Sequence, residues 1–444
     1  MINNVCCINK MQELFCNIKR NILFNNNNKL PEFDNDKTCI ENWIDWLIAH
    51  YPHIDSYKTF KDMIRPLIFK EYNDMLLVRY GNVYDYIDKN TTIDDFWNKY
   101  NGLYRECRSV VIDINTSEVI MLPMNKFFNI NELQETSYDN ILNKLSKVQY
   151  NHLLIEYSDK LDGSMICARY YQGEYLLTSS QALNPKNSWR LQDAYTMLTD
   201  NYKKMLYDHP NQTFIFEYIS QKDQHVVNYT KEQEGLYLIA ERDMVTSYTY
   251  SYNWLKIMAN KYNIKTTVLF NTDINYIMSH LDEKSSDQAE GFVINIDGYR
   301  VKLKYNDYVT MHKTLSSMMS PNYIIKAIAD ETFDDFISKV PSSYKENVQL
   351  IADKVFKYIQ YKNDQINSNY LYVKNTMSIE KKDFSNRKEF IRYINNYCNK
   401  DIHQYLICKY DNKEYSLIKS KNGKYIKMKQ VDEFLEFIDK NNIK

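Results

Sequence analysis

Short apolar runs separated by polar turns recur from about Pro66 to residue 310, and this pattern predicts a domain built of short β-strands. A run at 76–80 has the length of one strand. Runs at 109–113 and 119–122 flank the turn-forming residues Asn115–Ser117, so they predict a β-hairpin. The middle of the chain is therefore expected to contain sheets.

Helical periodicity replaces this pattern on both sides of the β-rich part. Residues 11–24 and the segment at 43–48 predict two helices with an apolar face. In the last third, apolar residues recur every three or four positions, which is typical of helices that pack into a core. These positions are Val348, Ile351, Val355, Ile359, Phe390, Ile391, Ile394 and Cys398. We expect an α+β fold with a helical N-terminal extension (1–62), a β-rich domain (63–310) and a mainly helical C-terminal domain (311–444).

A short terminal β-hairpin is predicted within the helical part, where residues 414–421 and 424–429 flank Asn422–Gly423. Seven lysines lie between positions 409 and 429, interleaved with tyrosines. Lysines of this kind can hold an RNA backbone while the tyrosines stack on bases, or they can simply protect a strand edge from pairing. The candidates for an RNA contact are Lys419, Lys421 and Lys424.

Composition adds limits to this picture. The 444 residues carry a formal net charge of only −1, so a nucleic-acid surface would have to be a local patch. No apolar run approaches the roughly 20 residues that span a bilayer, and the eight cysteines show no paired zinc-site spacing. We expect a monomer with reduced thiols and no membrane contact, located in the cytoplasm, or in the host cytoplasm if the chain is viral.

Lys160 is the centre of the candidate chemistry. It lies between apolar runs at 153–155 and 165–171, which predict two strands joined by the loop that contains Lys160. Gly163 would let a phosphate approach closely. A lysine attacks phosphorus only as the free amine, so its pKa of about 10.4 must be lowered at such a site. A solvated lysine in a polar turn is the ordinary alternative.

Two carboxylates and two lysines farther along the chain fit the same site. Glu217 and Glu290 lie in or beside apolar strands, where a carboxylate is either paired or exposed at a site because burying a lone charge is costly. Lys302 and Lys304 are two apart on a predicted strand and so share a face. Their repulsion would be relieved by a polyphosphate and would lower the pKa of a nearby lysine nucleophile. An ordinary exposed strand face is the alternative.

Arg108 and Lys126 lie just outside the two ends of the predicted hairpin. Taken singly, each fits a surface ion pair. Together, a guanidinium at one end of the hairpin and an ammonium past the other could both face an anion.

The order of these segments resembles the RNA ligase 1 family of the bacteriophage T4 type. Lys160-Leu-Asp-Gly has the form of the nucleotide-attachment motif of covalent nucleotidyltransferases. The resemblance covers roughly residues 70 to 310. Its further segments are 106–111, 125–129, 213–218, 225–229, 235–240, 290–293 and 301–304. The resemblance implies that 225–229 and 235–240 form a pair of strands.

The resemblance implies an adenylyltransferase domain with ATP-grasp-like antiparallel sheets and an ATP-dependent RNA ligase that joins 5′-phosphate and 3′-hydroxyl RNA ends. It implies that Lys160 carries AMP, that Glu217 binds the ribose and that Glu290 binds Mg²⁺ or Mn²⁺. Lys302 and Lys304 would bind phosphates, and Arg108 and Lys126 would lie at the phosphates or the RNA end. RNA repair, with a cleaved tRNA as substrate, is the implied biological role.

The chain departs from the family pattern in two places. Residues 177–181 read Leu-Thr-Ser-Ser-Gln where the family tends to supply a lysine, and the nearest basic residues, Lys186 and Arg190, are out of register. Ser109 follows Arg108 where the family prefers glycine.

Two other functional classes stay open. DNA ligases and capping guanylyltransferases share the lysine motif, but they carry a β-barrel OB domain after the last lysine segment, and residues 311–444 show no such pattern. An inactive RNA-end-binding protein with the same fold would bind RNA without forming a covalent adduct. The complete set of Lys160, Glu217, Glu290, Lys302 and Lys304 argues against this last class.

Overall fold

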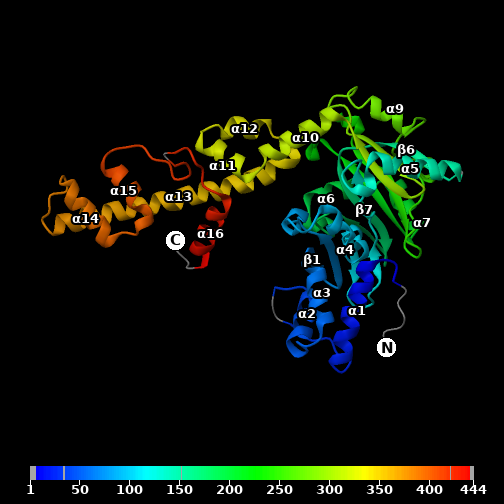
Figure 1. Cartoon of the computed structure of the whole chain (residues 1–444), viewed down its shortest axis with the longest axis horizontal. Helices are drawn as coiled ribbons and strands as arrows, with labels where there is room; N and C mark the ends of the chain where they lie inside the picture. The colour runs from blue at the N-terminus through cyan, green and yellow to red at the C-terminus, as the bar shows by residue number, and fades with distance from the viewer. Residues whose placement is uncertain (1–6, 34–35, 152, 421, 441–444) are drawn as a thin grey trace. The chain divides into compact units, whose positions relative to one another are not determined.

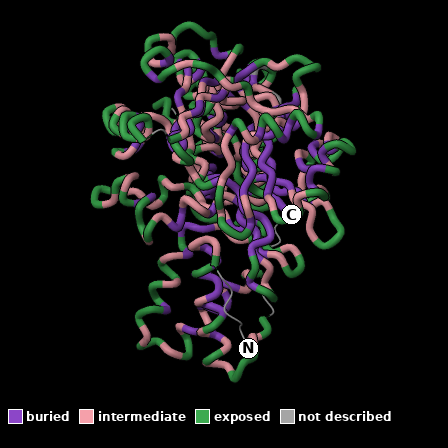
Figure 2. Tube along the Cα trace, turned by 90° about the vertical axis from the view of Figure 1, so that its right-hand side faces the viewer, coloured by how far each residue is buried: buried purple, intermediate pink, exposed green. Residues whose placement is uncertain are grey.

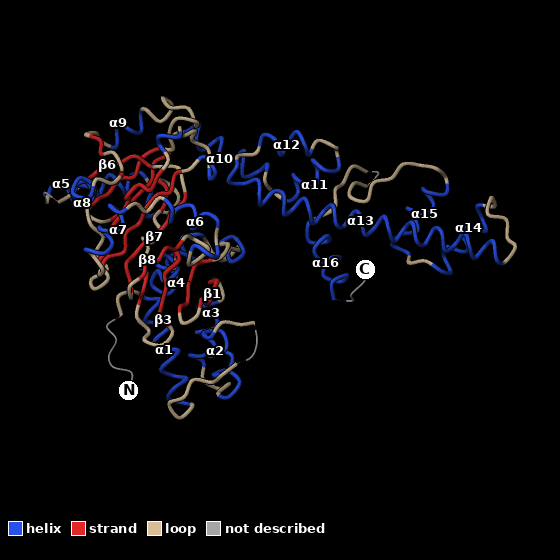
Figure 3. Tube along the Cα trace, turned by 180° about the vertical axis from the view of Figure 1, so that it is seen from behind, coloured by secondary structure: helices blue, strands red, loops and turns tan. Residues whose placement is uncertain are grey.

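The computed structural model describes residues 7–33, 36–151, 153–420 and 422–440. The chain divides into two compact units, Met1–Val309 and Thr310–Lys444. Among the described residues, the three sheets all lie in the first unit, and the second is built of helices and loops (Figure 1, Figure 3). The predicted α+β class with a helical C-terminal part is confirmed.

The first sheet packs against the N-terminal helices. Apolar side chains of these helices, including Phe15 and Ile18, share one core with Val78, Val110 and Ile112 of the sheet. The helices predicted at 11–24 and 43–48 and the β-hairpin are therefore confirmed. The elements are α1 (Lys10–Asn25), α2 (Cys39–His50), α3 (Asp55–Ile64), α4 (Ile93–Glu106), β1 (Leu67–Tyr72), β2 (Met75–Tyr80), β3 (Arg108–Asp113) and β4 (Val119–Met121), with strand order β1-β2-β3-β4.

Ser109 occupies a backbone conformation that favours glycine. Its φ is +77°, and the register between β2 and β3 shifts beside it, between Val78 and Arg79. Only glycine adopts positive φ without steric cost. The serine at this position is therefore a strained replacement, which gives the departure from the family pattern a physical meaning.

The second sheet lies between the first sheet and a layer of helices. One of its faces packs on Leu77, Val111 and Ile120 of the first sheet, and the other packs on α6, α7 and α8. Buried positions are dense along these strands (Figure 2). The elements are β7 (Ser164–Tyr171), β8 (Glu174–Thr178), β9 (Gln212–Ile219), β10 (Gly235–Asp243), β11 (Lys265–Thr266), α6 (Trp189–Thr196), α7 (Asp200–Asp208) and α8 (Tyr252–Tyr262), with strand order β11-β10-β9-β7-β8.

The strand predicted at 225–229 is wrong, because this segment is a loop. The backbone N–H groups of Val226 and Val227 both donate to Asp162 Oδ2, at 2.8 Å each. These donors are therefore used by a side chain and are not available for a strand ladder.

The third sheet carries Lys160 at the end of a strand. Its core packs on α5 and α9. The strands before and after Lys160 belong to different sheets, so Leu161–Gly163 connects the third sheet to the second. The elements are β5 (Phe128–Asn129), β6 (Ile155–Lys160), β12 (Leu269–Phe270), β13 (Gly291–Ile296), β14 (Tyr299–Lys304), α5 (Tyr138–Tyr150) and α9 (Ile274–Ser279), with strand order β12-β6-β13-β14-β5.

Short 3-10 helices complete the chain. They are η1 (Val83–Tyr86), η2 (Gln134–Thr136), η3 (Pro185–Asn187), η4 (Gln221–Asp223), η5 (Lys231–Gln233) and η6 (Lys400–Ile402).

The second unit is organised along one long helix of 38 residues, α13 (Ser342–Ile379). Val348 and Val355 are buried on it, as are Phe390 and Ile394 of α14, so the predicted apolar stripes are core positions. The other helices are α10 (Asn306–Met318), which crosses the boundary between the units, α11 (Pro321–Ala329), α12 (Phe333–Lys339), α14 (Arg387–Tyr397), α15 (His403–Tyr410) and α16 (Met428–Lys440). No OB barrel is formed by residues 310–420 and 422–440.

Among the described residues, the predicted terminal hairpin is reduced to one isolated bridge between Lys419 and Tyr425. The second predicted strand ends early, since α16 begins at Met428. Ile418 is buried in the helical core, and Tyr425 donates a hydrogen bond to Asp330. Packing against the helices therefore replaces a regular ladder.

No helix in the described ranges is both long and apolar enough to cross a membrane. The cysteines that the structure describes are all free thiols, whereas Cys6 lies outside the described residues.

Candidate active site

Lys160, Glu290 and Lys304 meet where three strands of the third sheet run side by side. Gly291 on β13 pairs with Lys160 of β6 on one side and with Lys304 of β14 on the other. Glu290, one residue earlier, lies between the two lysines. Its Oε2 accepts from Lys160 Nζ at 2.6 Å and its Oε1 from Lys304 Nζ at 2.8 Å, and its side chain is only 4% exposed. The sheet register therefore assembles a buried lysine–carboxylate–lysine cluster.

Glu290 controls the protonation of Lys160. Burial disfavours the charged amine, but the attraction of Glu290 and Glu217 and the hydrogen bond to Glu290 outweigh it, so the pKa of Lys160 lies above its ordinary value. The expectation that neighbouring lysines lower this pKa is wrong for the free protein. A carboxylate at hydrogen-bonding distance dominates the more distant positive charges.

Lys302 is the lysine whose charge is disfavoured. Burial holds the pKa of Lys302 well below its ordinary value, and the nearby cations Lys126, Lys160, Arg108 and Lys304 lower it further. Its ammonium nitrogen lies 4.5 Å from the centre of the Phe127 ring. Lys302 therefore stands in a positive environment that an anion would relieve.

Two glycines are required by close packing at the site. A Cβ on Gly163 would lie 2.3 Å from the carbonyl oxygen of Tyr218, and a Cβ on Gly291 would lie 2.0 Å from that of Leu303. Both contacts are too short for any side chain. The Gly163 N–H also donates to Glu217 Oε1 at 3.0 Å, which positions that carboxylate beside the lysine loop.

Glu217 titrates near neutrality. Burial raises the pKa of Glu217 to about 7; Lys160 and the Gly163 N–H counteract this rise, and Glu290 adds to it. A half-buried carboxyl beside a pocket can accept a hydrogen bond from a ligand hydroxyl in either protonation state.

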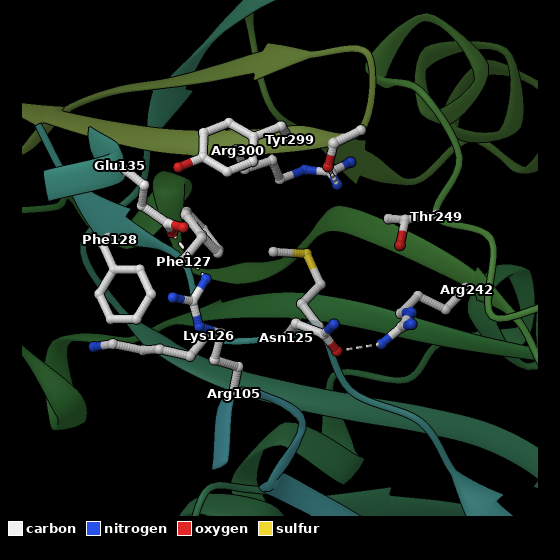
Figure 4. Close-up of a pocket in the computed structure, with 12 residues that line it drawn as sticks. Arg105, Asn125, Lys126, Phe127, Phe128, Glu135, Arg242, Thr249, Tyr299 and Arg300 are labelled. Carbon is white, nitrogen blue, oxygen red and sulfur yellow. Dashed lines mark hydrogen bonds and ion pairs between the residues drawn. The ribbon is translucent and has the colours of Figure 1, made fainter. Parts of the chain in front are cut away.

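Part of the predicted site lines one pocket. It contains the predicted residues Lys160, Lys302, Glu217 and Arg108, whereas Lys126 lines an adjoining pocket (Figure 4). The pocket of Lys160 is lined by Arg108, Met124, Phe127, Asp159, Lys160, Leu161, Gly163, Met165, Glu217, Ile239, Tyr252, Thr267, Val293 and Lys302. The structure thus brings four of the predicted residues to one pocket and ties two more, Glu290 and Lys304, to Lys160.

Asp162 was not predicted as a site residue, although it lies in the lysine motif. It is buried, accepts from the loop at Val226 and Val227, and accepts from the Tyr308 hydroxyl at 2.8 Å. Its own N–H donates to the Tyr229 hydroxyl at 2.9 Å. Asp162 therefore anchors the lysine loop to two distant segments, and its place in the motif was the available signal.

A second buried carboxylate, Asp223, anchors the other side of the loop. It accepts two hydrogen bonds of 2.6 Å from Arg190 and one of 2.6 Å from Ser164. Although burial raises the pKa of Asp223, its bonds to His225, Arg190 and Ser164 lower the value to about 2. No sequence signal connected these residues, because they come from three separate segments.

The contacts of Arg190 explain why it does not replace the lysine missing from 177–181. Its guanidinium is engaged by Asp223, and Lys186 is exposed. At the turn itself, Lys70 of β1 donates to the Gln181 carbonyl at 2.8 Å.

The candidate RNA-binding lysines of the second unit differ among themselves. Lys419 forms an ion pair with Asp330 at 2.5 Å. Lys424 is exposed, and Lys421 lies outside the described residues.

The chain does not build a metal site of its own in the described ranges, where no group of three or more His, Cys, Asp or Glu side chains could hold an ion. Glu290 does hold two ammonium groups, so a cation at this carboxylate matches the charge it already attracts. Mg²⁺ commonly binds through one or two carboxylates and substrate phosphates, with waters completing its shell. The donor set therefore fits a metal that arrives with a nucleotide.

Comparisons with known proteins agree with the resemblance. Residues 106–314 match the family model described as RNA ligase, which confirms the predicted family resemblance over these residues. A protein of Autographa californica nuclear polyhedrosis virus, named "Putative bifunctional polynucleotide kinase/RNA ligase", is 24% identical over 258 residues. That match covers 53% of this chain and 35% of the viral protein, so the chain spans about a third of that relative's length.

Solved structures of ligases are also similar to this chain. A Naegleria gruberi RNA ligase with pyrophosphate has 18% sequence identity and a TM-score of 0.32, covering 39% of this chain and 56% of that one. An archaeal ATP-dependent RNA ligase has 13% identity and a TM-score of 0.40, covering 70% of this chain and 78% of that one.

Proposed function

We propose, from the match of residues 106–314 to the RNA ligase family, that this chain is an ATP-dependent RNA ligase that joins a 5′-phosphate end to a 3′-hydroxyl end. The observation that carries the proposal is the buried cluster of Lys160, Glu290 and Lys304 beside a pocket that also contains Lys302 and Glu217. A structural ion pair would not need a pocket lined by further cations.

In the first step, Lys160 Nζ attacks the α-phosphorus of ATP. The N–P bond forms, the bond from phosphorus to the bridging oxygen breaks, and pyrophosphate leaves with the electron pair. Lys160 must first lose a proton, and the nearest acceptor is Glu290 Oε2 at 2.6 Å. In the second step, an oxygen of the RNA 5′-phosphate attacks the phosphorus of AMP, and the N–P bond to Lys160 breaks. In the third step, the 3′-hydroxyl oxygen attacks the RNA 5′-phosphorus and loses its proton; the phosphodiester bond forms and AMP leaves.

The fixed cations of the site suit this chemistry, because negative charge builds on phosphate oxygens in each step. Lys302 and Arg108 line the pocket and would bind phosphates, and Lys304 would do so when released from Glu290. Glu217 would accept a hydrogen bond from the ribose. A divalent ion at Glu290, Mg²⁺ or Mn²⁺, would neutralise part of the phosphate charge.

One Naegleria gruberi RNA ligase mutant is described with ATP and Mn. RNA repair, with a cleaved tRNA as the natural substrate, is part of our proposal on the strength of the family resemblance.

The proposal is tested by incubating the purified chain with Mg²⁺ and ATP labelled at the α-phosphate, then separating it on a denaturing gel. We expect a labelled band that pyrophosphate removes and that Lys160→Ala lacks, a loss of at least about a thousandfold because the nucleophile itself is removed. Lys70→Ala is the matched control, since Lys70 is a lysine outside the pocket.

A chain that takes no label from ATP, GTP or NAD, and carries no AMP by mass, would contradict the ligase assignment. Binding of RNA ends without label would then favour an inactive RNA-end-binding protein.

A further inference from the structure

A second pocket adjoins the pocket of Lys160 and shares Met124 and Phe127 with it. The segment 124–128 forms its floor, and the beginning of β14 and the end of β10 form its sides (Figure 4). Its charged lining residues are mostly basic: Arg105, Lys126, Arg242 and Arg300 against Glu135 alone. This excess of positive charge calls for a ligand of opposite sign.

Arg242 and Arg300 are the unusual members of this lining. Arg105 has Glu135 as a carboxylate partner at 2.8 Å, but within the described ranges neither Arg242 nor Arg300 forms an ion pair. Arg242 is 6% exposed and Arg300 is 7% exposed. The Nε atom of each is buried without a hydrogen-bond partner among the described residues. Glu106 attracts Arg242 from beyond ion-pair distance. Buried guanidinium groups that no carboxylate contacts directly are costly, so an anion would stabilise them.

The two arginines are held in different ways. Arg242 donates to the carbonyls of Pro123 at 2.6 Å and Ser247 at 2.9 Å, which fixes it in the wall. Among the described residues, Arg300 donates two long hydrogen bonds, to the carbonyls of Gly298 at 3.4 Å and Tyr250 at 3.3 Å. Its guanidinium also lies over the Tyr252 ring, 5.5 Å from the ring centre. Arg300 is therefore the better placed of the two to exchange its present contacts for a ligand.

The strand β14 links this pocket to the catalytic lysine. Alternate residues of a strand share a face, so Arg300 continues the row of Lys302 and Lys304 at steps of roughly 6.6 Å. Lys304 contacts Glu290, Lys302 lines the pocket of Lys160, and Arg300 lines the second pocket. An anionic chain that begins at Lys160 and follows β14 would therefore meet the basic side chains of Lys304, Lys302 and Arg300 in turn.

The second pocket is also aromatic. Phe127, Phe128 and Tyr299 line it (Figure 4). Aromatic side chains stack on bases and pack against ribose, whereas inorganic pyrophosphate has no apolar part. Two guanidinium groups that form no ion pair in the described ranges, together with aromatic walls, fit a phosphorylated nucleotide better than the β and γ phosphates of ATP.

We propose that the second pocket binds the 5′-terminal nucleotide of the RNA substrate, with Arg300 and Arg242 holding a phosphate group of that end. The inference rests on the proposed ligase function and extends it by assigning a place to the RNA end. It makes Arg300 a substrate-binding residue for the transfer of AMP to RNA.

The test measures binding of a fluorescent 5′-phosphorylated oligoribonucleotide to the full chain and to Arg300→Gln. We expect the dissociation constant to rise about tenfold, because a hydrogen-bonded charge pair is lost. Arg300→Lys keeps the charge but not the planar fork, so it should give a smaller rise and it covers the case in which Arg300→Gln does not fold. The same oligonucleotide with a 5′-hydroxyl should bind wild type and variant equally.

Arg169→Gln is the matched control. In the described ranges, the hydrogen bonds of Arg169 likewise go to backbone carbonyls, those of Pro210 and Ile120, and Arg169 lines neither pocket. It should bind the phosphorylated oligonucleotide as wild type does.

AMP labelling of Lys160, measured without RNA, separates the two sources of phosphate. A fall in labelling as large as the loss of RNA binding would overturn the proposal and assign the pocket to ATP. An unchanged dissociation constant for Arg300→Gln would also overturn it. If the wild type takes no AMP label, the ligase function fails on its own, and the binding measurement still decides the role of the pocket.

Discussion

Two lysine–carboxylate contacts of similar length have very different surroundings in the two units. Lys160 and Glu290 lie 2.6 Å apart with side chains 18% and 4% exposed, whereas Lys419 and Asp330 lie 2.5 Å apart with side chains 36% and 28% exposed. The second pair is open to screening by solvent, whereas burial protects most of the first pair from it. The length of an ion pair therefore says little about its energy, which depends on how far the charges are removed from water.

The buried pair also shares its carboxylate. Glu290 serves Lys304 as well as Lys160, so removing one charge leaves two lysines without a partner. In the second unit, Asp330 also accepts from the Tyr425 hydroxyl, and solvent can replace either partner. The Lys160–Glu290–Lys304 cluster is suited to a catalytic site, whereas the Lys419–Asp330 pair is suited to holding a loop on the helices.

The largest expected effect comes from Glu290→Gln. The substitution keeps the shape but leaves Lys160 and Lys304 buried without a counter-charge, so we expect the unfolding free energy to fall by about 3 kcal/mol. AMP labelling should fall by at least about a hundredfold, because Glu290 is both the proton acceptor and the metal ligand that we propose for the reaction. Thermal unfolding and the labelling assay measure the two effects.

The equivalent substitution in the second unit, Asp330→Asn, is the control for Glu290→Gln. A similar loss of stability in both variants would contradict the distinction between the buried and the exposed pair.

An intermediate effect is expected from Glu217→Gln, and it depends on pH. Burial raises the pKa of Glu217 to about 7, so the folded protein binds more protons than the unfolded chain between roughly pH 4.3 and 7. Stability from this carboxyl is therefore present below that window and is lost as the pH rises through it. Glu217→Gln should remove this pH-dependent loss of unfolding free energy, which is up to about 3 kcal/mol. Thermal unfolding of the wild type and the variant at pH 5 and pH 8 measures it.

Glu241→Gln is a matched variant for Glu217→Gln. Burial raises the pKa of Glu241 to about 7 as well, and this residue accepts from Trp254 Nε1 at 2.9 Å but does not line the pocket of Lys160. Both variants should flatten the pH dependence of stability, and only Glu217→Gln should raise the ATP concentration needed for labelling. A rise of equal size in both would contradict a ribose contact at Glu217.

The smallest effect is expected for the lysines of the second unit. Lys419→Ala should shift the thermal midpoint by less than about 1 °C, because an exposed pair contributes little. If the predicted hairpin at 414–429 contacts RNA, Lys424→Ala should reduce the slope of the logarithm of the RNA-binding constant against the logarithm of the salt concentration by about one. Lys419→Ala should reduce this slope by less, because Asp330 already compensates the charge of Lys419. Equal salt dependence in wild type and both variants would exclude this segment as an RNA contact.

Local pattern was sufficient for much of the fold and of the site. The helices at 11–24 and 43–48, the hairpin around Asn115 and the stripes on α13 and α14 follow from periodicity, which reports which face of a local element is buried. The sequence Lys-x-Asp-Gly and the later segments were sufficient to identify the RNA ligase resemblance, because their order is readable along the chain.

Local pattern failed where a distant side chain took the place of a backbone partner. The strand predicted at 225–229 is a loop because Asp162 accepts its N–H groups, and the predicted terminal hairpin is held by Asp330 and the helical core. Such long-range competition has no signature in a short window of sequence.

The sequence by itself determined which charged residues this protein has and which of them lie near the ends of strands. Only the tertiary structure decided how they are paired. The register of β6, β13 and β14 places Glu290 between Lys160 and Lys304, and so raises the pKa of the lysine that was expected to have it lowered. The protonation of a buried group is set by neighbours from other segments and by the exclusion of water, and both arise only when the chain has folded.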